Sequence, residues 1–203
     1  MGVNLVKGQK VNLQKSDGGT LRRVVVGLGW DEAKPQQSGG FLGGLFGGAK
    51  TQNIDCDASA FVCINGKVTA TADIVYFGNL RHSSGAIQHM GDNLTGAGAG
   101  DDEQIVVDLQ QVPQNYDKII FVVNIYQARQ RNQHFGMIQN AFIRIVDADN
   151  NQELCRYNLS ENYNNMTAMV FGEIYRHNGQ WKFSAVGQAT EDNDIRSLAA
   201  RFS

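Results

Sequence analysis

Short apolar runs bounded by turn residues recur along most of the chain, and some of them alternate with the period of two that is typical of β-strands. The clearest runs, rich in β-branched residues, are 23–30, 118–126 and 141–148. Asn-Gly pairs at 65–66 and 178–179 are typical of tight hairpin turns. About ten short strands with little helix predict a mainly all-β fold, an antiparallel two-sheet β-sandwich with a few short helices.

The end of the chain has a different period. From Ile195 to Phe202, apolar side chains recur at the spacing i, i+3, i+4 and i+7. Thr190 or Asp192 is suited to cap the start of such a helix. The pattern predicts an amphipathic C-terminal helix at about 191–202.

Residues 35–52 interrupt the strand pattern. This stretch contains three Gly-Gly pairs around Phe41-Leu42 and Leu45-Phe46, which favours a flexible insertion within a single domain spanning 1–203. Its four large apolar side chains either fold back on the domain or dock on a partner or a membrane surface. The sequence therefore leaves oligomerisation and peripheral membrane association open.

Acidic residues gather in the segment 91–103, which holds four acids, Asn93 and four glycines. From His82 to Asp117 the sequence has no Lys or Arg, so six acids have no positive neighbour along the chain. Carboxylates held close together repel one another unless one is protonated or a cation lies between them. Glycines allow backbone carbonyls to turn inward as further oxygen ligands. The pattern favours a Ca²⁺ site ahead of Mg²⁺, with a solvated acidic loop as the alternative.

Two other segments bring acids to strand ends. Asp31 follows directly on the strand 23–30. In the segment 53–64, Asp55, Asp57 and Ser59 fall on one face of an extended chain, and small apolar residues fall on the other. Aspartates are poor strand formers, so metal binding is a reason for their presence there.

Several other sites are disfavoured. An EF-hand starting at Asp55 would have Ala60 and Gly66 where the invariant Gly and the final Glu belong. A phosphate loop at 96–100 would run into the acids of 101–103, which repel an anion. The four histidines and three cysteines have no zinc-finger spacing. For a glycosidase, a carboxylate pair is available, but the sequence reveals no groove of aromatic residues.

Composition narrows the setting of the protein. A net charge of −2 gives no field that would attract nucleic acid. No apolar stretch is long enough to span a bilayer, and the first residues do not resemble a signal peptide. Three unpatterned cysteines are typical of reduced thiols in a cytoplasmic protein.

Several motifs, in this order, resemble those of the TerD family of tellurium-resistance and general-stress proteins. The matching segments are 27–31 (GLGWD), 55–61 (DCDASAF), 91–96 (GDNLTG), 100–103 (GDDE), 135–137 (FGM), 140–144 (NAFIR) and 171–176 (FGEIYR). The resemblance covers nearly the whole chain, from Gly2 to about residue 186.

The resemblance implies a bacterial cytosolic β-sandwich in which acidic loops hold two neighbouring Ca²⁺ ions. It also implies a role in tellurite resistance or stress, other stress-operon proteins as partners, and no established enzymatic activity. Ala97 and Ala99 stand where many members carry an acid, which implies that one calcium site is weakened. The metal ligands implied by the matching motifs are Asp31, Asp55, Asp57, Asp92, Asn93, Asp101, Asp102 and Glu103.

Three functional hypotheses follow. The leading one is a calcium-binding, non-catalytic stress protein. The second is a divalent-metal-dependent hydrolase or phosphotransferase that uses the same ion pair, with His89 as its base. The third is direct handling of tellurite by Cys56, Cys63 or Cys155.

Overall fold

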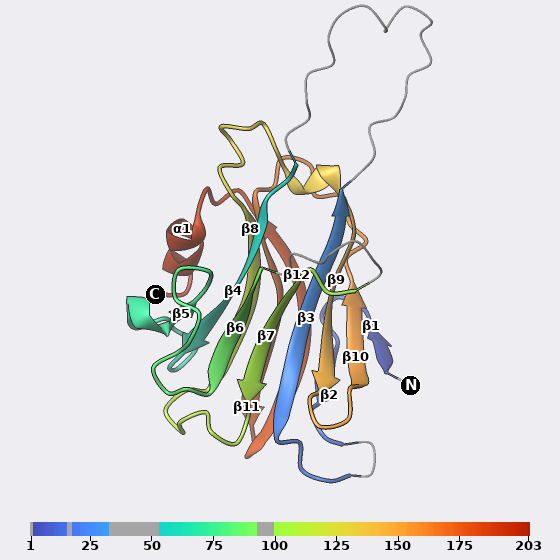
Figure 1. Ribbon diagram of the computed structural model, residues 1–203, viewed down its shortest axis with the longest axis vertical. Helices are drawn as coiled ribbons and strands as arrows, with labels where there is room; N and C mark the ends of the chain where they lie inside the picture. Colours follow the sequence, from blue (N-terminus) through green and yellow to red (C-terminus); the bar gives the residue numbers. More distant parts are fainter. Residues whose placement is uncertain (1, 16–17, 33–52, 93–99) are drawn as a thin grey trace, which may run out of the picture.

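The computed structural model describes residues 2–15, 18–32, 53–92 and 100–203, and these residues form two six-stranded sheets packed face to face (Figure 1). The predicted β-sandwich is thus confirmed. The insertion predicted at 35–52 and the middle of the acidic segment lie outside the described residues. The first sheet has the order β1 (Val3–Leu5), β10 (Gln152–Asn158), β9 (Ile138–Asp147), β3 (Arg23–Glu32), β7 (Glu103–Asp108), β6 (Ile87–Asp92). The second has the order β2 (Lys10–Asn12), β12 (Gln180–Thr190), β11 (Ala168–His177), β8 (Lys118–Ile125), β4 (Cys56–Cys63), β5 (Ile74–Val75).

One strand pair differs from the predicted antiparallel arrangement. β1 pairs with β10 in parallel, with Val3 opposite Cys155. The chain then turns at Gly8, where φ is +82°, and β2 joins the other sheet beside β12. Because β1 and β2 belong to different sheets, no hairpin fixes the direction of β1, and it joins the edge of the first sheet in parallel.

The predicted turn chemistry is confirmed in two hairpins. Asn65 and Gly66 have φ angles of 53° and 75°, and Asn178 and Gly179 have φ angles of 51° and 76°. Positive φ at both central residues matches the right-handed twist of the strands that the turn connects.

Alternation along the strands fills the space between the sheets. Val24, Val26 and Leu28 of β3 face inward and are fully buried. Phe121 and Phe171 of the second sheet lie in the same core and are also fully buried. Burial of such side chains is the main favourable contribution to folding, at about 25 cal/mol per Å² of apolar surface.

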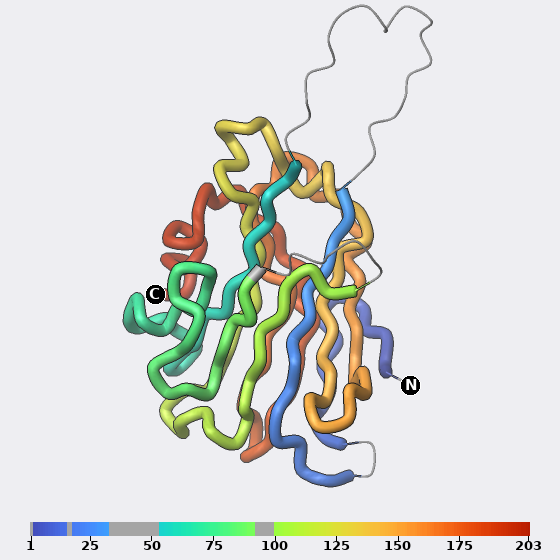
Figure 2. The backbone as a smooth tube through the Cα atoms, in the orientation of Figure 1, coloured from blue at the N-terminus to red at the C-terminus, as the bar shows by residue number. Residues whose placement is uncertain are grey.

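The outer face of the second sheet is covered as well. Leu198 and Ala199 of the helix α1 (Ile195–Ala200) pack against Phe61 and Val122 in a second apolar cluster. The helix is shorter than the predicted 191–202 because Asp194 is its N-cap, accepting a hydrogen bond from the Ser197 backbone N–H at 2.8 Å. The two ends of the chain lie on opposite flanks of the sandwich (Figure 2).

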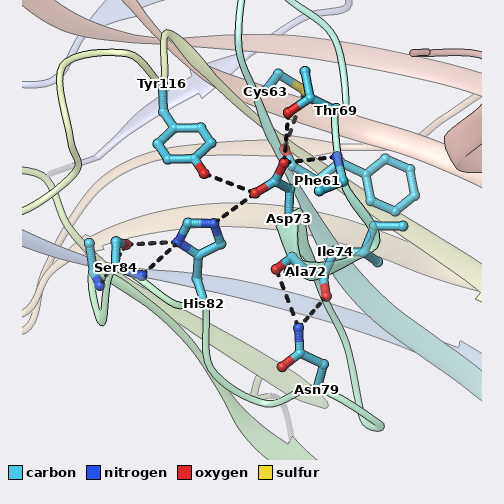
Figure 3. A network of polar contacts seen from close by, with 12 residues as sticks. Phe61, Cys63, Thr69, Ala72, Asp73, Ile74, Asn79, His82, Ser84 and Tyr116 are labelled. Carbon is cyan, nitrogen blue, oxygen red and sulfur yellow. Dashed lines mark hydrogen bonds and ion pairs between the residues drawn. The ribbon is translucent and has the colours of Figure 1, made fainter.

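A buried polar network anchors the segment that connects β5, in the second sheet, to β6, in the first sheet. It surrounds Asp73, the last residue of the 3₁₀ helix η1 (Thr71–Asp73); a second 3₁₀ helix, η2 (Phe135–Met137), precedes β9. Asp73 Oδ1 accepts hydrogen bonds from the Tyr116 hydroxyl at 2.9 Å and from His82 Nε2 at 3.2 Å (Figure 3). Burial raises the pKa of Asp73, but the bonds from Tyr116, His82 and Thr69 outweigh burial and bring the pKa below its ordinary value.

Removing the Tyr116 hydroxyl should loosen this anchor. We expect Tyr116→Phe to lower the free energy of unfolding by about 1–2 kcal/mol, because a buried carboxylate loses one donor. Urea denaturation measures the change. The loss should shrink as the pH falls through the lowered pKa of Asp73, because the bond stabilises the ionised carboxylate.

Tyr175→Phe is the matched control, because the Tyr175 ring contacts Lys10 and its hydroxyl has no hydrogen-bond partner among the described residues. Equal stability losses in the two variants would show that the bond to Asp73 contributes nothing specific.

Candidate acidic site at the strand ends

Predicted acids from both sheets lie at the ends of β3, β4 and β7. Glu103, the first residue of β7, lies opposite Leu28 of β3. Its carboxylate crosses to the other sheet and accepts a hydrogen bond from the Ala58 backbone N–H of β4, with an Oε2–N distance of 2.5 Å. Glu103 therefore joins the two sheets at the point where the acidic segment enters β7.

Asp102 is bound to the end of β3, one residue before Asp31. Its Oδ2 accepts a hydrogen bond at 2.6 Å from the backbone N–H of Trp30, the residue before Asp31. Burial raises the pKa of Asp102, the Trp30 bond opposes that rise, and the charges of Asp31, Glu103 and Asp101 add to it. Asp31 itself accepts a hydrogen bond from the Asn140 side chain at 2.8 Å. The structure thus brings together carboxylates that repel one another at the ends of β3 and β7.

Asp101 is paired with a positively charged side chain that was not predicted from the sequence. Arg144 of β9 donates two hydrogen bonds to it, Nε to Oδ1 at 2.6 Å and Nη2 to Oδ2 at 3.0 Å. A Cβ on Gly27 would overlap the Asp101 carboxylate, so a glycine at that position makes room for the carboxylate against the sheet. The acids therefore lack a positive neighbour along the sequence, but Asp101 has one in the folded protein. The alternation of 141–148, which turns Arg144 away from the core, was the available signal.

Asp55 and Asp57 approach from the second sheet. Asp55 is exposed, and its Oδ2 lies 3.8 Å from Arg131 Nη1. Asp57 lies opposite Asn124 of β8, and Ser59 occupies the next position on the same face, as the alternation predicted. Asp55 and Asp57 thus lie toward the same end of the sandwich as Glu103, and Asp57 faces the outer side of the second sheet.

Two predicted ligands, Asp92 and Asn93, come at the end of β6 and directly after it in the sequence. The backbone of Asp92, at the end of β6, pairs with Glu103 of β7. Asn93 lies outside the described residues.

His89, the base required by the hydrolase hypothesis, is buried and engaged at both ring nitrogens. Its Nδ1 accepts a hydrogen bond from the Gly91 backbone N–H at 3.0 Å, so the proton lies on Nε2. Nε2 then faces the Ala58 carbonyl at 3.1 Å and Glu103 Oε2 at 3.4 Å. These bonds hold the ring between the two sheets, and nothing in the geometry favours a catalytic role.

The three cysteines are buried free thiols. Burial raises the pKa of Cys63 and of Cys155 to about 12. For Cys56, burial and then the charges of Asp57 and Asp55 raise the pKa well above its ordinary value. A thiol that stays protonated is a poor nucleophile and a poor metal ligand, which disfavours direct chemistry with tellurite.

The donor chemistry of the strand ends fits a hard cation, because the candidate ligands offer oxygen atoms. Asp101 and Glu103 are already held by Arg144 and by the Ala58 amide, so Asp31 and Asp102 are the more open pair. In the part of the chain that the structure describes, no three His, Cys, Asp or Glu side chains are grouped closely enough to hold an ion by themselves.

The fold and this site define a β-sandwich protein with acids from both sheets concentrated at the strand ends. The TerD domain model matches residues 1–202, and the chain belongs to this family. It is 50% identical over 202 residues to stress response protein SCP2 of Bacillus subtilis (strain 168), covering 100% of both chains. It is 47% identical to tellurium resistance protein TerD of Serratia marcescens, covering 93% of this chain and 91% of the relative.

A solved structure supports the fold independently. A homologue of telluride resistance protein from Streptomyces coelicolor A3(2) superposes with a TM-score of 0.62 at 20% identity, covering 91% of this chain and 99% of that chain. In the described residues, no helix has the length and apolar character needed to cross a membrane.

Proposed function

We propose that the protein is a calcium-binding, non-catalytic stress-response protein that acts in the cytoplasm and contributes to tellurite resistance. The names of its relatives support the stress and resistance role. Three buried, free thiols support a reducing compartment. The engaged ring of His89 gives no support to a hydrolase or phosphotransferase.

The contact between Asp102 and the end of β3 carries the calcium proposal. The Trp30 N–H holds the Asp102 carboxylate beside Asp31, where the two charges repel. A divalent cation between them would turn that repulsion into attraction. We assign Asp31 and Asp102 as the central ligands, with Asp92 and Asn93 completing the coordination from the end of β6.

The remaining predicted residues have two roles in this proposal. Asp57 of β4 and Asp55, which precedes that strand, provide ligands toward a second ion. Asp101 and Glu103 flank Asp102 in the sequence, and their bonds to Arg144 and to the Ala58 amide fix its backbone. Calcium would join loops from both sheets and screen their carboxylates.

Metal analysis tests the proposal. Protein purified without chelator should contain calcium, about two ions per chain, one of them weakly held because Ala97 and Ala99 replace acids. Elemental analysis by mass spectrometry after exhaustive desalting measures the content. Asp31→Asn combined with Asp102→Asn should lose at least one ion, whereas Asp149→Asn, an exposed acid paired with Lys15, should lose none. Calcium-free protein, or zinc in its place, would refute the assignment.

A further inference from the structure

A cavity of about 340 Å³ opens on the outer face of the second sheet, between β4, β8 and the start of α1. Its floor is made by side chains of the two strands, Ser59 from β4 and Asn124 from β8 among them. The turn after β5, the loop after β8 and the residues before α1 form its walls. A cavity of this size accommodates a small molecule.

The floor of the cavity contains an unpaired polar atom. Ser59 is fully buried, and its Oγ has no hydrogen-bond partner among the described residues. Asn124, one strand away, is only 7% exposed. A buried hydroxyl without a partner costs free energy, so native proteins almost always supply one from the chain, a water molecule or a ligand. Because Ser59 lines the cavity, a bound molecule is able to supply that partner.

The rim of the cavity exposes aromatic rings. Phe77 is 60% exposed, and Tyr126 is 41% exposed. The ring of Phe77 is held edge-on against Tyr76, with 5.2 Å between ring centroids. A fixed, exposed ring beside a polar cavity offers a flat apolar face on which a ligand can stack.

The loop after β8 is held in a costly conformation at the same rim. Gln127 has a φ of +52°, and among the described residues with positive φ it alone is neither Gly nor Asn. Its side-chain amide donates a hydrogen bond to the Tyr126 hydroxyl at 3.2 Å. Strained backbone of this kind is concentrated at ligand sites, where the surrounding structure maintains it.

The charges around the cavity disfavour an anionic ligand. Asp57 and Asp194 line it and would repel an anion. The guanidinium of Arg131 lies 5.1 Å from the centroid of the Tyr126 ring, so that ring already has a cation beside it. Carboxamides such as Asn124 and Asn193 both donate and accept hydrogen bonds, which matches a ligand rich in hydroxyl groups.

We propose that this cavity binds a neutral sugar ring, whose hydroxyls bond to Ser59 and to the carboxamides while its C–H face stacks on Phe77. No aromatic groove is evident in the sequence because the rings come from segments around residues 76–77 and 126, which only the fold brings together. This site does not include the proposed calcium ligands Asp31 and Asp102, but Asp57 lines it and is also the proposed ligand toward a second ion.

Amide NMR spectra of the full chain, titrated with glucose, galactose, mannose and N-acetylglucosamine, test the proposal. At least one sugar should shift the resonances of Ser59, Asn124 and Tyr126 in chelator-treated protein, in which Asp57 holds no ion. Phe77→Ala and Ser59→Ala should each weaken that binding about tenfold. Phe77 is exposed and Ser59 has no bond to lose, so both variants should fold.

Leu80→Ala is the matched control, because Leu80 is 44% exposed on the same stretch of chain but does not line the cavity. It should leave sugar binding unchanged. The proposal is overturned if none of the four sugars shifts these resonances, which would leave water as the partner of Ser59. It is equally overturned if sugar binding persists unchanged in Phe77→Ala, or if spermidine or sulfate, and no sugar, shifts the same resonances.

Discussion

Replacing Arg144 with methionine is expected to lower the free energy of unfolding by about 3–5 kcal/mol, which is the usual cost of leaving a buried carboxylate without its cation. The Asp101 side chain is only 1% exposed, and Arg144 donates two hydrogen bonds to it. Methionine keeps much of the apolar stem but supplies no charge and no donor. Urea denaturation followed by circular dichroism measures the loss, and the melting temperature should fall by roughly 6–20 °C.

Two further variants distinguish the loss of this ion pair from a general destabilisation of the sheet. Glu153→Gln removes the other partner of Arg144, which is 3.4 Å away and partly exposed, and should cost less than about 1 kcal/mol. Asp101→Leu combined with Arg144→Met leaves no buried charge and should recover much of the loss. A loss below about 1 kcal/mol in Arg144→Met alone would contradict the role assigned to the pair.

Much of the fold was predictable because it depends on local patterns. The β-branched run 23–30 predicted a buried strand, and Val24, Val26 and Leu28 lie in the core. The alternation of 141–148 places Arg144 on the face opposite its buried neighbours. The Asn-Gly pair at 65–66 determined a tight turn through its own backbone preferences. These features depend on neighbours in sequence, which a single chain displays directly.

The partners of the acids were not predictable in the same way. Asp101 and Arg144 are 43 residues apart, and Glu103 and the Ala58 amide are 45 residues apart. Whether a carboxylate meets an arginine, a backbone amide or a metal ion depends on which strands become neighbours. The absence of Lys and Arg from the sequence around 91–103 therefore indicated an unneutralised cluster more strongly than the structure supports.

The covering of the outer face of the second sheet could not be predicted from the sequence either. Alternation correctly placed Asp57 and Ser59 on one face of β4, which would suit an edge facing solvent. In the structure, α1 packs against this face, and Ser59 is completely buried. The helix period at 195–202 predicted that α1 exists but not the sheet on which it packs.

Calcium is expected to raise the melting temperature of the chelator-treated protein. At a hundredfold excess over the dissociation constant, binding to the folded state alone adds about 2.7 kcal/mol. For a chain of this size, that corresponds to roughly 5–11 °C. The physical source is the relief of repulsion between Asp31 and Asp102, whose charges interact at the end of β3, where the Trp30 amide binds Asp102.

Asp102→Asn should stabilise the calcium-free protein and weaken its stabilisation by calcium. Asparagine still offers a carbonyl oxygen to the Trp30 N–H, but it removes one of the repelling charges. The variant should therefore melt at or above the wild-type temperature in chelator and gain much less from calcium. Differential scanning calorimetry over a calcium titration measures both effects, with Asp149→Asn as the control that keeps the full wild-type response. Equal calcium responses in Asp102→Asn and wild type would place any bound ion elsewhere on the molecule.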